Sequence, residues 1–124
     1  MKAKHRHRVL LVEDDPDCRE AVKALLESEG YNVTTAGDGQ QALDRVRQHH
    51  DLCAILLDLM LPVRDGWWFR AQQLRDPDLA AVPVVVVSGA GQVDRAAQQL
   101  GVQDYIAKPV QPEQLCTILA RNCR

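Results

Sequence analysis

Asp58 stands at an unusual place in the sequence, because apolar residues flank it on both sides. The run AILL at 54–57 precedes it, and LML at 59–61 follows it. A charge at the edge of a hydrophobic core is costly unless it is paired, hydrated or bound to a metal. The sequence therefore predicts a partner for this carboxylate elsewhere in the chain.

The candidate partners each come at the end of another apolar run. They are Glu13 and Asp14 after 8–12, Ser88 at the end of 83–88, and Lys108 after 103–107. Bare carboxylates at 13, 14 and 58 would repel one another, and a divalent cation that prefers oxygen ligands would relieve this repulsion. Mg²⁺ fits, because it takes a few carboxylates, keeps several waters and can share its coordination shell with a phosphate.

This group of side chains suits phosphoryl transfer. A carboxylate held beside a cation can attack phosphorus and form an acyl phosphate. The cation and Lys108 would offset the charge on the transferring group, while the Ser88 hydroxyl and nearby backbone N–H groups would bind its oxygens. The residues alone therefore indicate phosphoryl chemistry at these carboxylates.

Two alternating periodicities predict the elements that position these residues. Short apolar or β-branched runs predict strands over 8–12, 31–36, 52–57, 83–88 and 103–107. Amphipathic spacing predicts helices over 16–29, 39–49, 66–75, 93–100 and 112–122. Strict alternation implies an α/β fold, in which right-handed crossovers place helices on both faces of a parallel sheet. In such a sheet the working site lies beyond the carboxyl ends of the strands, where the strand order switches.

The composition is that of one globular domain: 124 residues, 46% hydrophobic and 26% charged. Lys plus Arg is 15 and Asp plus Glu is 17, which argues against a general nucleic-acid binder. Neither a signal peptide nor a membrane span is expected, because the apolar runs are too short. We expect a cytoplasmic protein with reduced thiols at Cys18, Cys53, Cys116 and Cys123, since none of them forms a C-x-x-C pair.

The chain is predicted to divide into a short tail and a domain. Residues 1–7 are basic and are expected to form a flexible N-terminus, although a weak arm for anions or nucleic acid is the alternative. Residues 8–124 form the expected domain. The histidines at 5, 7, 49 and 50 lack the cysteine or carboxylate spacing of a zinc site.

Four motifs resemble those of a response-regulator receiver domain. They are LLVEDDP at 10–16, LLDLMLPVRDG at 56–66, PVVVVSG at 83–89 and DYIAKPV at 104–110. The resemblance covers residues 8 to about 122. It implies a flavodoxin-like fold with strand order 2-1-3-4-5, and phosphotransfer from a histidine of a sensor kinase or phosphotransfer protein.

The resemblance also implies roles for individual residues. Asp58 is the expected phosphoacceptor, and the expected metal ligands are Asp14, Asp58, the backbone carbonyl of Met60 and, through water, Glu13. Lys108 is expected to bind the phosphate, Ser88 to be the switch hydroxyl and Tyr105 the switch aromatic, and the Lys108–Pro109 bond to be cis. Phosphorylation is then expected to change the surface formed by the fourth helix, fifth strand and fifth helix, which a partner reads.

Purely structural roles remain open as alternatives for some of these residues. Asp15 is more simply a helix cap, Tyr105 is alternatively an ordinary half-buried strand residue, and Ser88 alternatively just ends its strand. Position 110 is Val where many relatives carry Phe, so we expect different packing of the last loop. Helix phase predicts that Trp67 and Phe69 face inward and Trp68 outward.

Met60 and Ala90 cannot orient a water for attack on the phosphate, which predicts slow self-dephosphorylation. A haloacid-dehalogenase-type phosphatase would need an acid at position 60. A flavodoxin-like FMN carrier would need a phosphate loop where this chain reads EDDPD. A degenerate receiver that serves only as a binding platform is the third alternative, against which the complete set of site residues argues. The sequence does not identify the output of the signal, because the chain is either a stand-alone receiver or a piece of a larger regulator or hybrid kinase. No direct contact with nucleic acid or a membrane is expected.

Overall fold

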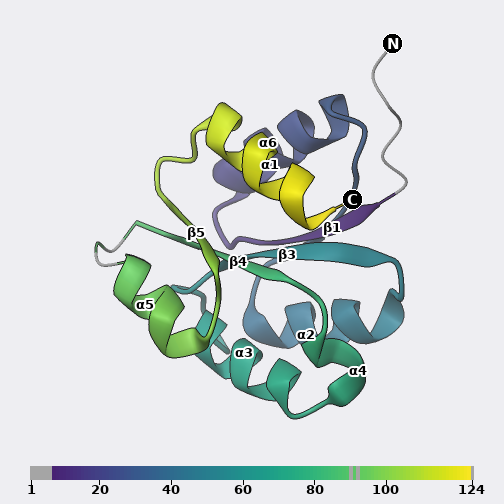
Figure 1. Cartoon of the computed structure of the whole chain (residues 1–124), viewed down its shortest axis with the longest axis vertical. Coiled ribbons are helices and arrows are strands. Elements are labelled where there is room, and N and C mark those ends of the chain that lie inside the picture. The colour runs from purple at the N-terminus through teal and green to yellow at the C-terminus, as the bar shows by residue number, and fades with distance from the viewer. Residues whose placement is uncertain (1–6, 90, 92, 124) are drawn as a thin grey trace.

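A five-stranded parallel sheet forms the centre of the molecule (Figure 1). The computed structural model describes residues 7–89, 91 and 93–123. The strands are β1 (Arg8–Val12), β2 (Asn32–Ala36), β3 (Leu52–Asp58), β4 (Val84–Ser88) and β5 (Asp104–Ala107). Their order is β2-β1-β3-β4-β5, which confirms the predicted α/β fold and its strand order 2-1-3-4-5.

Helices cover both faces of this sheet (Figure 1). Helices α1 (Pro16–Ser28) and α6 (Pro112–Asn122) lie on one face. The other face carries α2 (Gly39–Gln48), α3 (Gly66–Leu74), α4 (Pro77–Ala80) and α5 (Val93–Leu100). In the described ranges, no helix combines the length and the hydrophobicity that crossing a bilayer requires.

Helix starts follow the capping signals of the sequence. The Asp15 carboxylate accepts hydrogen bonds from the N–H groups of Asp17 and Cys18, with Pro16 at the first helical position. Asp38 caps α2 in the same way through the Gln41 N–H. The sequence does not predict helix α4, because Asp-Pro at 76–77 is typical of the end of a helix. In the structure Asp76 also caps a new turn.

Two hydrophobic layers hold the sheet between the helices, because alternate strand residues face opposite sides. Leu10, Ile55 and Val86 pack toward α2, α3, α4 and α5, while Leu11 and Leu56 pack toward α1 and α6. The central strand β3 is buried on both faces, as its continuous apolar run predicts. Strand β2 is half-buried, as expected for an edge.

The predicted orientation of the tryptophans is wrong. Trp67 is exposed at 38%, whereas Trp68 is half-buried against the core, and the Arg64 guanidinium lies 5.1 Å from its ring centroid. The inward face of α3 is formed by Phe69 and, unexpectedly, by Gln73, both fully buried. Gln73 can occupy the core because its amide donates to the carbonyls of Leu79 and Val82.

The expectation of four reduced thiols is also wrong. Cys53, at the start of β3, forms a disulfide with Cys123, directly after α6, across 70 residues of sequence. Helix α6 packs over this part of the sheet, so the two Cα atoms lie 5.1 Å apart. Cys18 and Cys116 are not part of a disulfide. Of the predicted flexible tail, only His7 falls within the described residues.

Candidate functional site

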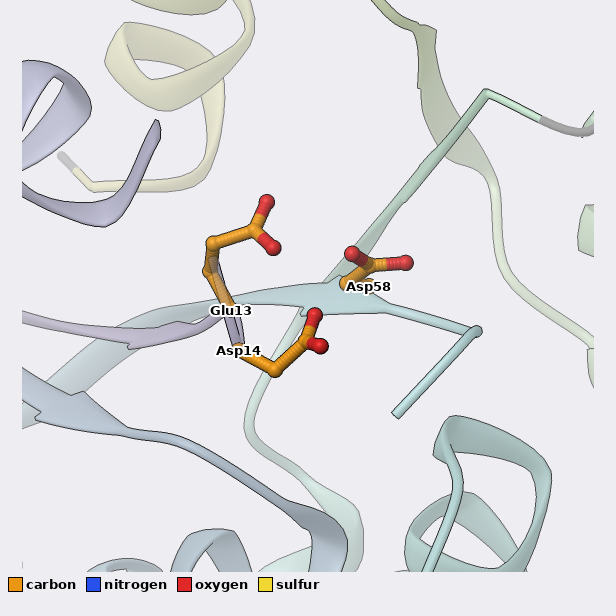
Figure 2. Close-up of side chains that lie close together, drawn as sticks. All are labelled: Glu13, Asp14 and Asp58. Carbon is orange, nitrogen blue, oxygen red and sulfur yellow. The ribbon is translucent and has the colours of Figure 1, made fainter. Parts of the chain in front are cut away.

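Three carboxylates meet at the carboxyl edge of the sheet, where β1 and β3 lie side by side. Glu13 and Asp14 follow β1 directly, and Asp58 ends β3. Figure 2 shows the three side chains turned toward one another, and one carboxylate oxygen of each lies within 4.8 Å of the others. This edge is the switch point of the strand order, as the sequence predicts.

Lys108 forms an ion pair with Asp58. Its ammonium Nζ lies 2.8 Å from Asp58 Oδ2 and 2.6 Å from Glu13 Oε1. The fold brings these residues together across 50 and 95 residues of sequence. Lys108 follows β5 and is anchored there, since its N–H donates to the Ser88 carbonyl. The Lys108–Pro109 peptide bond is cis, as expected.

Burial and charge compete at these two groups. Burial raises the pKa of Asp58, and the Glu13 charge adds to this, against the opposing hydrogen bonds from Lys108 and from the Met60 N–H. Burial by itself would lower the pKa of Lys108, but the hydrogen bonds and charges of Asp58 and Glu13 outweigh it and raise that pKa. The ammonium therefore stays protonated and holds two buried carboxylates.

Glu13 and Asp14 are neighbours with different surroundings. Glu13 is 4% exposed; its carboxylate accepts from Lys108 and from the Asp15 N–H, at 3.1 Å. Asp14 is exposed to solvent. A cation that approaches the cluster from solvent therefore meets Asp14 first and Asp58 behind it, whereas Glu13 already has partners on both oxygens.

The remaining predicted residues lie along the same edge or beside it. Ser88 ends β4 and is buried, one position beyond Val87, which pairs in register with Asp58. Met60 is 68% exposed, and its N–H donates to Asp58 Oδ1 at 3.0 Å. Tyr105 lies on β5 with its side chain 41% exposed, so the ring is outside the core in this structure. Ala90 lies outside the described residues.

Two contributors to the site could not be found in the sequence. The Arg19 guanidinium donates from Nη1 to the Glu13 carbonyl at 3.0 Å, but an arginine in an amphipathic helix normally indicates a solvated face. Gly66 lies so close to β3 that a Cβ there would approach the Asp58 carbonyl oxygen to 2.7 Å. The start of α3 thus packs directly behind Asp58.

The donor set fits a hard divalent cation. Three carboxylates offer oxygen ligands, one of them exposed, and exposed Asp14 leaves room for the waters that Mg²⁺ retains. Soft or nitrogen-seeking metals are less well served, because histidine and thiolate are absent from this three-residue cluster.

Fold and site together define a class: a doubly wound α/β protein with an acidic, lysine-bridged site at its switch point. The family model for the response regulator receiver domain matches residues 9–120. The chain belongs to this family. It is therefore a receiver domain of two-component signal transduction, which is a signalling domain.

Two transcriptional regulators are similar to this chain and agree with this assignment. The chain is 38% identical over 111 residues to the transcriptional regulatory protein CpxR of Escherichia coli, covering 88% of this chain and 46% of CpxR. It is also 38% identical over 112 residues to the transcriptional regulator RpaA of Synechocystis, covering 87% of this chain and 45% of RpaA. The chain thus spans less than half the length of these relatives.

Solved structures match over almost the whole chain. The receiver domain of the sensor histidine kinase PA1611 from Pseudomonas aeruginosa has a TM-score of 0.87 and 36% identity, over 95% of this chain and 98% of that one. That structure has a magnesium ion coordinated in the active-site cleft. The chemotaxis protein CheY4 of Vibrio cholerae has a TM-score of 0.84 and 26% identity, over 94% and 98%.

Proposed function

We propose that this receiver domain accepts a phosphoryl group on Asp58 from a phosphohistidine of a sensor kinase or phosphotransfer protein, with Mg²⁺ as cofactor. The observation that carries the proposal is the Lys108 ammonium, which bridges Asp58 and Glu13 beside exposed Asp14. A lysine that holds two buried carboxylates at a solvent-accessible edge leaves one of them ready to bind an incoming phosphoryl group.

The transfer step follows from this arrangement. A carboxylate oxygen of Asp58 attacks phosphorus, a P–O bond forms, and the P–N bond to the donor imidazole breaks. The imidazole leaves with the electron pair of that bond and takes a proton from solvent. Lys108 offsets negative charge on the transferring group, and the hydroxyl of Ser88 donates to one of its oxygens.

The proposed metal ligands are Asp14, Asp58 and the Met60 backbone carbonyl, with Glu13 acting through water. Bound there, Mg²⁺ would supply charge neutralisation at the phosphoryl oxygens. The carboxylates of Asp14 and Asp58 lie within 4.8 Å of each other, which supports the assignment. Asp14 is exposed, so a hydrated ion can reach it.

The proposed switch uses Ser88 and Tyr105. A phosphoryl group on Asp58 adds strong acceptor oxygens, which favour a position of Ser88 that donates to them. Tyr105, exposed in this structure, then turns inward behind Ser88. This changes the surface of α5, β5 and α6, which corresponds to the predicted surface of the fourth helix, fifth strand and fifth helix because the short α4 shifts the numbering.

The proposed partners are a sensor histidine kinase or phosphotransfer protein upstream and an output protein or domain downstream, in the cytoplasm. Direct contact of residues 8–124 with nucleic acid or a membrane is not part of the proposal. Nor is an external turnover substrate, since the only group modified is the domain's own aspartate.

Substitution of the acceptor tests this function. The Asp58→Asn variant is expected to gain no phosphoryl mass when it is incubated with Mg²⁺ and an acyl phosphate, whereas the wild type gains one phosphoryl group by intact-protein mass spectrometry. Asp17→Asn, which changes an exposed acid in the first turn of α1, is the matched control and should behave as the wild type. Phosphorylation of Asp58→Asn to the wild-type level would show that the acceptor is another residue.

A further inference from the structure

Arg19 holds the turn that carries the two acids after β1. Its Nη1 atom donates a partly buried hydrogen bond of 3.0 Å to the Glu13 carbonyl oxygen. On the other side of the same residue, the Glu13 N–H donates to the Ala36 carbonyl at 3.0 Å. Both backbone groups of Glu13 are therefore fixed, one by the neighbouring strand and one by a side chain of α1.

This carbonyl matters because of the planarity of the peptide bond. The Glu13 C=O and the Asp14 N–H belong to one rigid plane, so a bond that orients the carbonyl also orients the start of Asp14. Asp14 is exposed and has little packing of its own to set its direction. The Arg19 bond thus helps to fix the position from which the Asp14 side chain extends.

The guanidinium lies near the turn between β2 and α2, since a Cβ built on Gly37 would be 3.9 Å from Nη1. The Gly37 N–H in that turn donates to the Gln41 side chain at 2.9 Å. Arg19 therefore reaches from α1 to the backbone that follows β1, and its partner there is a carbonyl rather than a carboxylate.

We infer that Arg19 is a positioning residue for the acidic cluster, and that it strengthens Mg²⁺ binding through the Glu13 peptide although its own charge opposes a cation. The inference rests on the proposed function, in which Asp14 is a metal ligand. The two effects of Arg19 have opposite signs. Its positive charge weakens binding of Mg²⁺ by simple repulsion, whereas its hydrogen bond strengthens binding by preorganising Asp14.

The Arg19→Gln variant separates these effects. Glutamine is too short to reach the Glu13 carbonyl and carries no charge. If positioning dominates, the Mg²⁺ dissociation constant rises by about 10-fold, the size typical of residues that orient metal ligands. If charge alone acts, the dissociation constant falls. Isothermal titration calorimetry of the purified whole chain with MgCl₂ measures it directly, without phosphorylation.

Two further measurements distinguish positioning from charge. The ratio of wild-type to variant affinity should stay above one and rise when ionic strength increases from about 20 to about 300 mM, because salt screens the opposing repulsion of Arg19 but not its hydrogen bond. In the metal-free protein, amide hydrogen exchange at Asp14 and Asp15 should be faster in Arg19→Gln. Lys23→Gln, which removes a positive charge one turn further along α1, is the control and should change neither quantity.

Conservative variants complete the test. Arg19→Lys restores a donor and is expected to recover most of the affinity. Mg²⁺ affinity that falls in the order wild type, Arg19→Lys, Arg19→Gln supports the inference. An Arg19→Gln variant that binds Mg²⁺ as tightly as the wild type, or more tightly, overturns it. Arg19→Met, which keeps the apolar stem, replaces Gln if that variant fails to fold, and the same outcomes apply. A wild type that binds no Mg²⁺ at millimolar concentrations overturns the proposed metal site instead.

Discussion

Lys108 determines the charge balance of the site. Asp58 and Glu13 are both nearly inaccessible to solvent, with 5% and 4% of their surfaces exposed, and each is hydrogen-bonded to the same ammonium. Removing one member of a buried charge group costs more than the group contributes as a whole, because the remaining charges lose their partner. Here two carboxylates would be left facing each other.

The Lys108→Met variant should therefore be less stable by about 3 kcal/mol at neutral pH. The loss should shrink as the pH falls, because burial already raises the pKa of Asp58, and a native state that binds more protons than the unfolded state gains stability as pH falls. Urea unfolding at neutral and at mildly acidic pH measures this. Lys23→Met is the control, and an equal loss at both pH values would contradict the explanation.

The contacts of Lys108 with Asp58 and Glu13 should also affect stability at high pH. The carboxylates raise the pKa of Lys108 above its ordinary value of 10.5, so its stabilising effect is complete below that pH and is lost only as pH rises further. The wild type should lose this contribution under strongly alkaline conditions, and Lys108→Met has none to lose.

At the residue scale the sequence predicts which groups meet, but not how they are oriented. Glu13, Asp14, Asp58, Ser88 and Lys108 each follow or end a strand, and parallel strands end at one edge. Which acid is buried is decided by side-chain conformation: Glu13 turns back to Lys108 and to the Asp15 N–H, and Asp14 does not. The negative charge that both neighbours carry does not predict which of them is buried.

The segment between β3 and α3, residues 59–65, is the element nearest the proposed acceptor. It contains exposed Met60 and also Val63 at φ +63°, an unfavourable backbone conformation for a β-branched residue. The Arg64 carbonyl accepts from the Gly39 N–H at 2.6 Å, which ties the segment to α2. The segment is thus held close to Asp58, and the apolar thioether of Met60 is its side chain beside the site.

A side chain that can orient water should change the phosphate lifetime at this position. Met60 offers no strong acceptor, so phosphorylated wild type should lose phosphate over minutes or longer, and Met60→Asn should lose it several-fold faster. Release of radiolabelled phosphate from the phosphorylated proteins, in buffer with excess Mg²⁺ and no EDTA, measures both rates. Val63→Asn alters an exposed residue of the same segment and serves as control. Wild-type loss within seconds would contradict the prediction.

At the element scale, prediction succeeds where apolar runs and caps agree and fails where a polar side chain enters the core. Strands β3 and β4 are continuous apolar runs, and α6 has the predicted bounds. The phase of α3 is misjudged because Gln73 fills the place expected for an apolar residue, while Leu74 is 51% exposed. Its burial depends on the Leu79 and Val82 carbonyls, which only the folded chain brings near.

The disulfide acts at the scale of the whole molecule. Strand order follows from the alternation of elements, but contact between Cys53 and Cys123 depends on how the end of α6 lies over the start of β3. Sequence spacing carries no information about such a contact, so four cysteines without a C-x-x-C pair give no basis for pairing. The bond joins the central strand to the last helix of the receiver domain.

This bond should stabilise the domain chiefly by restricting its unfolded chain. A closed loop of 70 residues corresponds to about 4 kcal/mol in the chain-entropy model, so dithiothreitol should lower the unfolding midpoint of the oxidised wild type markedly. The Cys53→Ser/Cys123→Ser variant should unfold at the lower midpoint in either condition, whereas Cys116→Ser should keep the response. Under denaturing, non-reducing conditions, Ellman's reagent should detect two thiols, Cys18 and Cys116. Four reactive thiols in air-oxidised protein, or a midpoint indifferent to reductant, would mean that the bond does not form in solution, and α6 would then be held to β3 by packing alone.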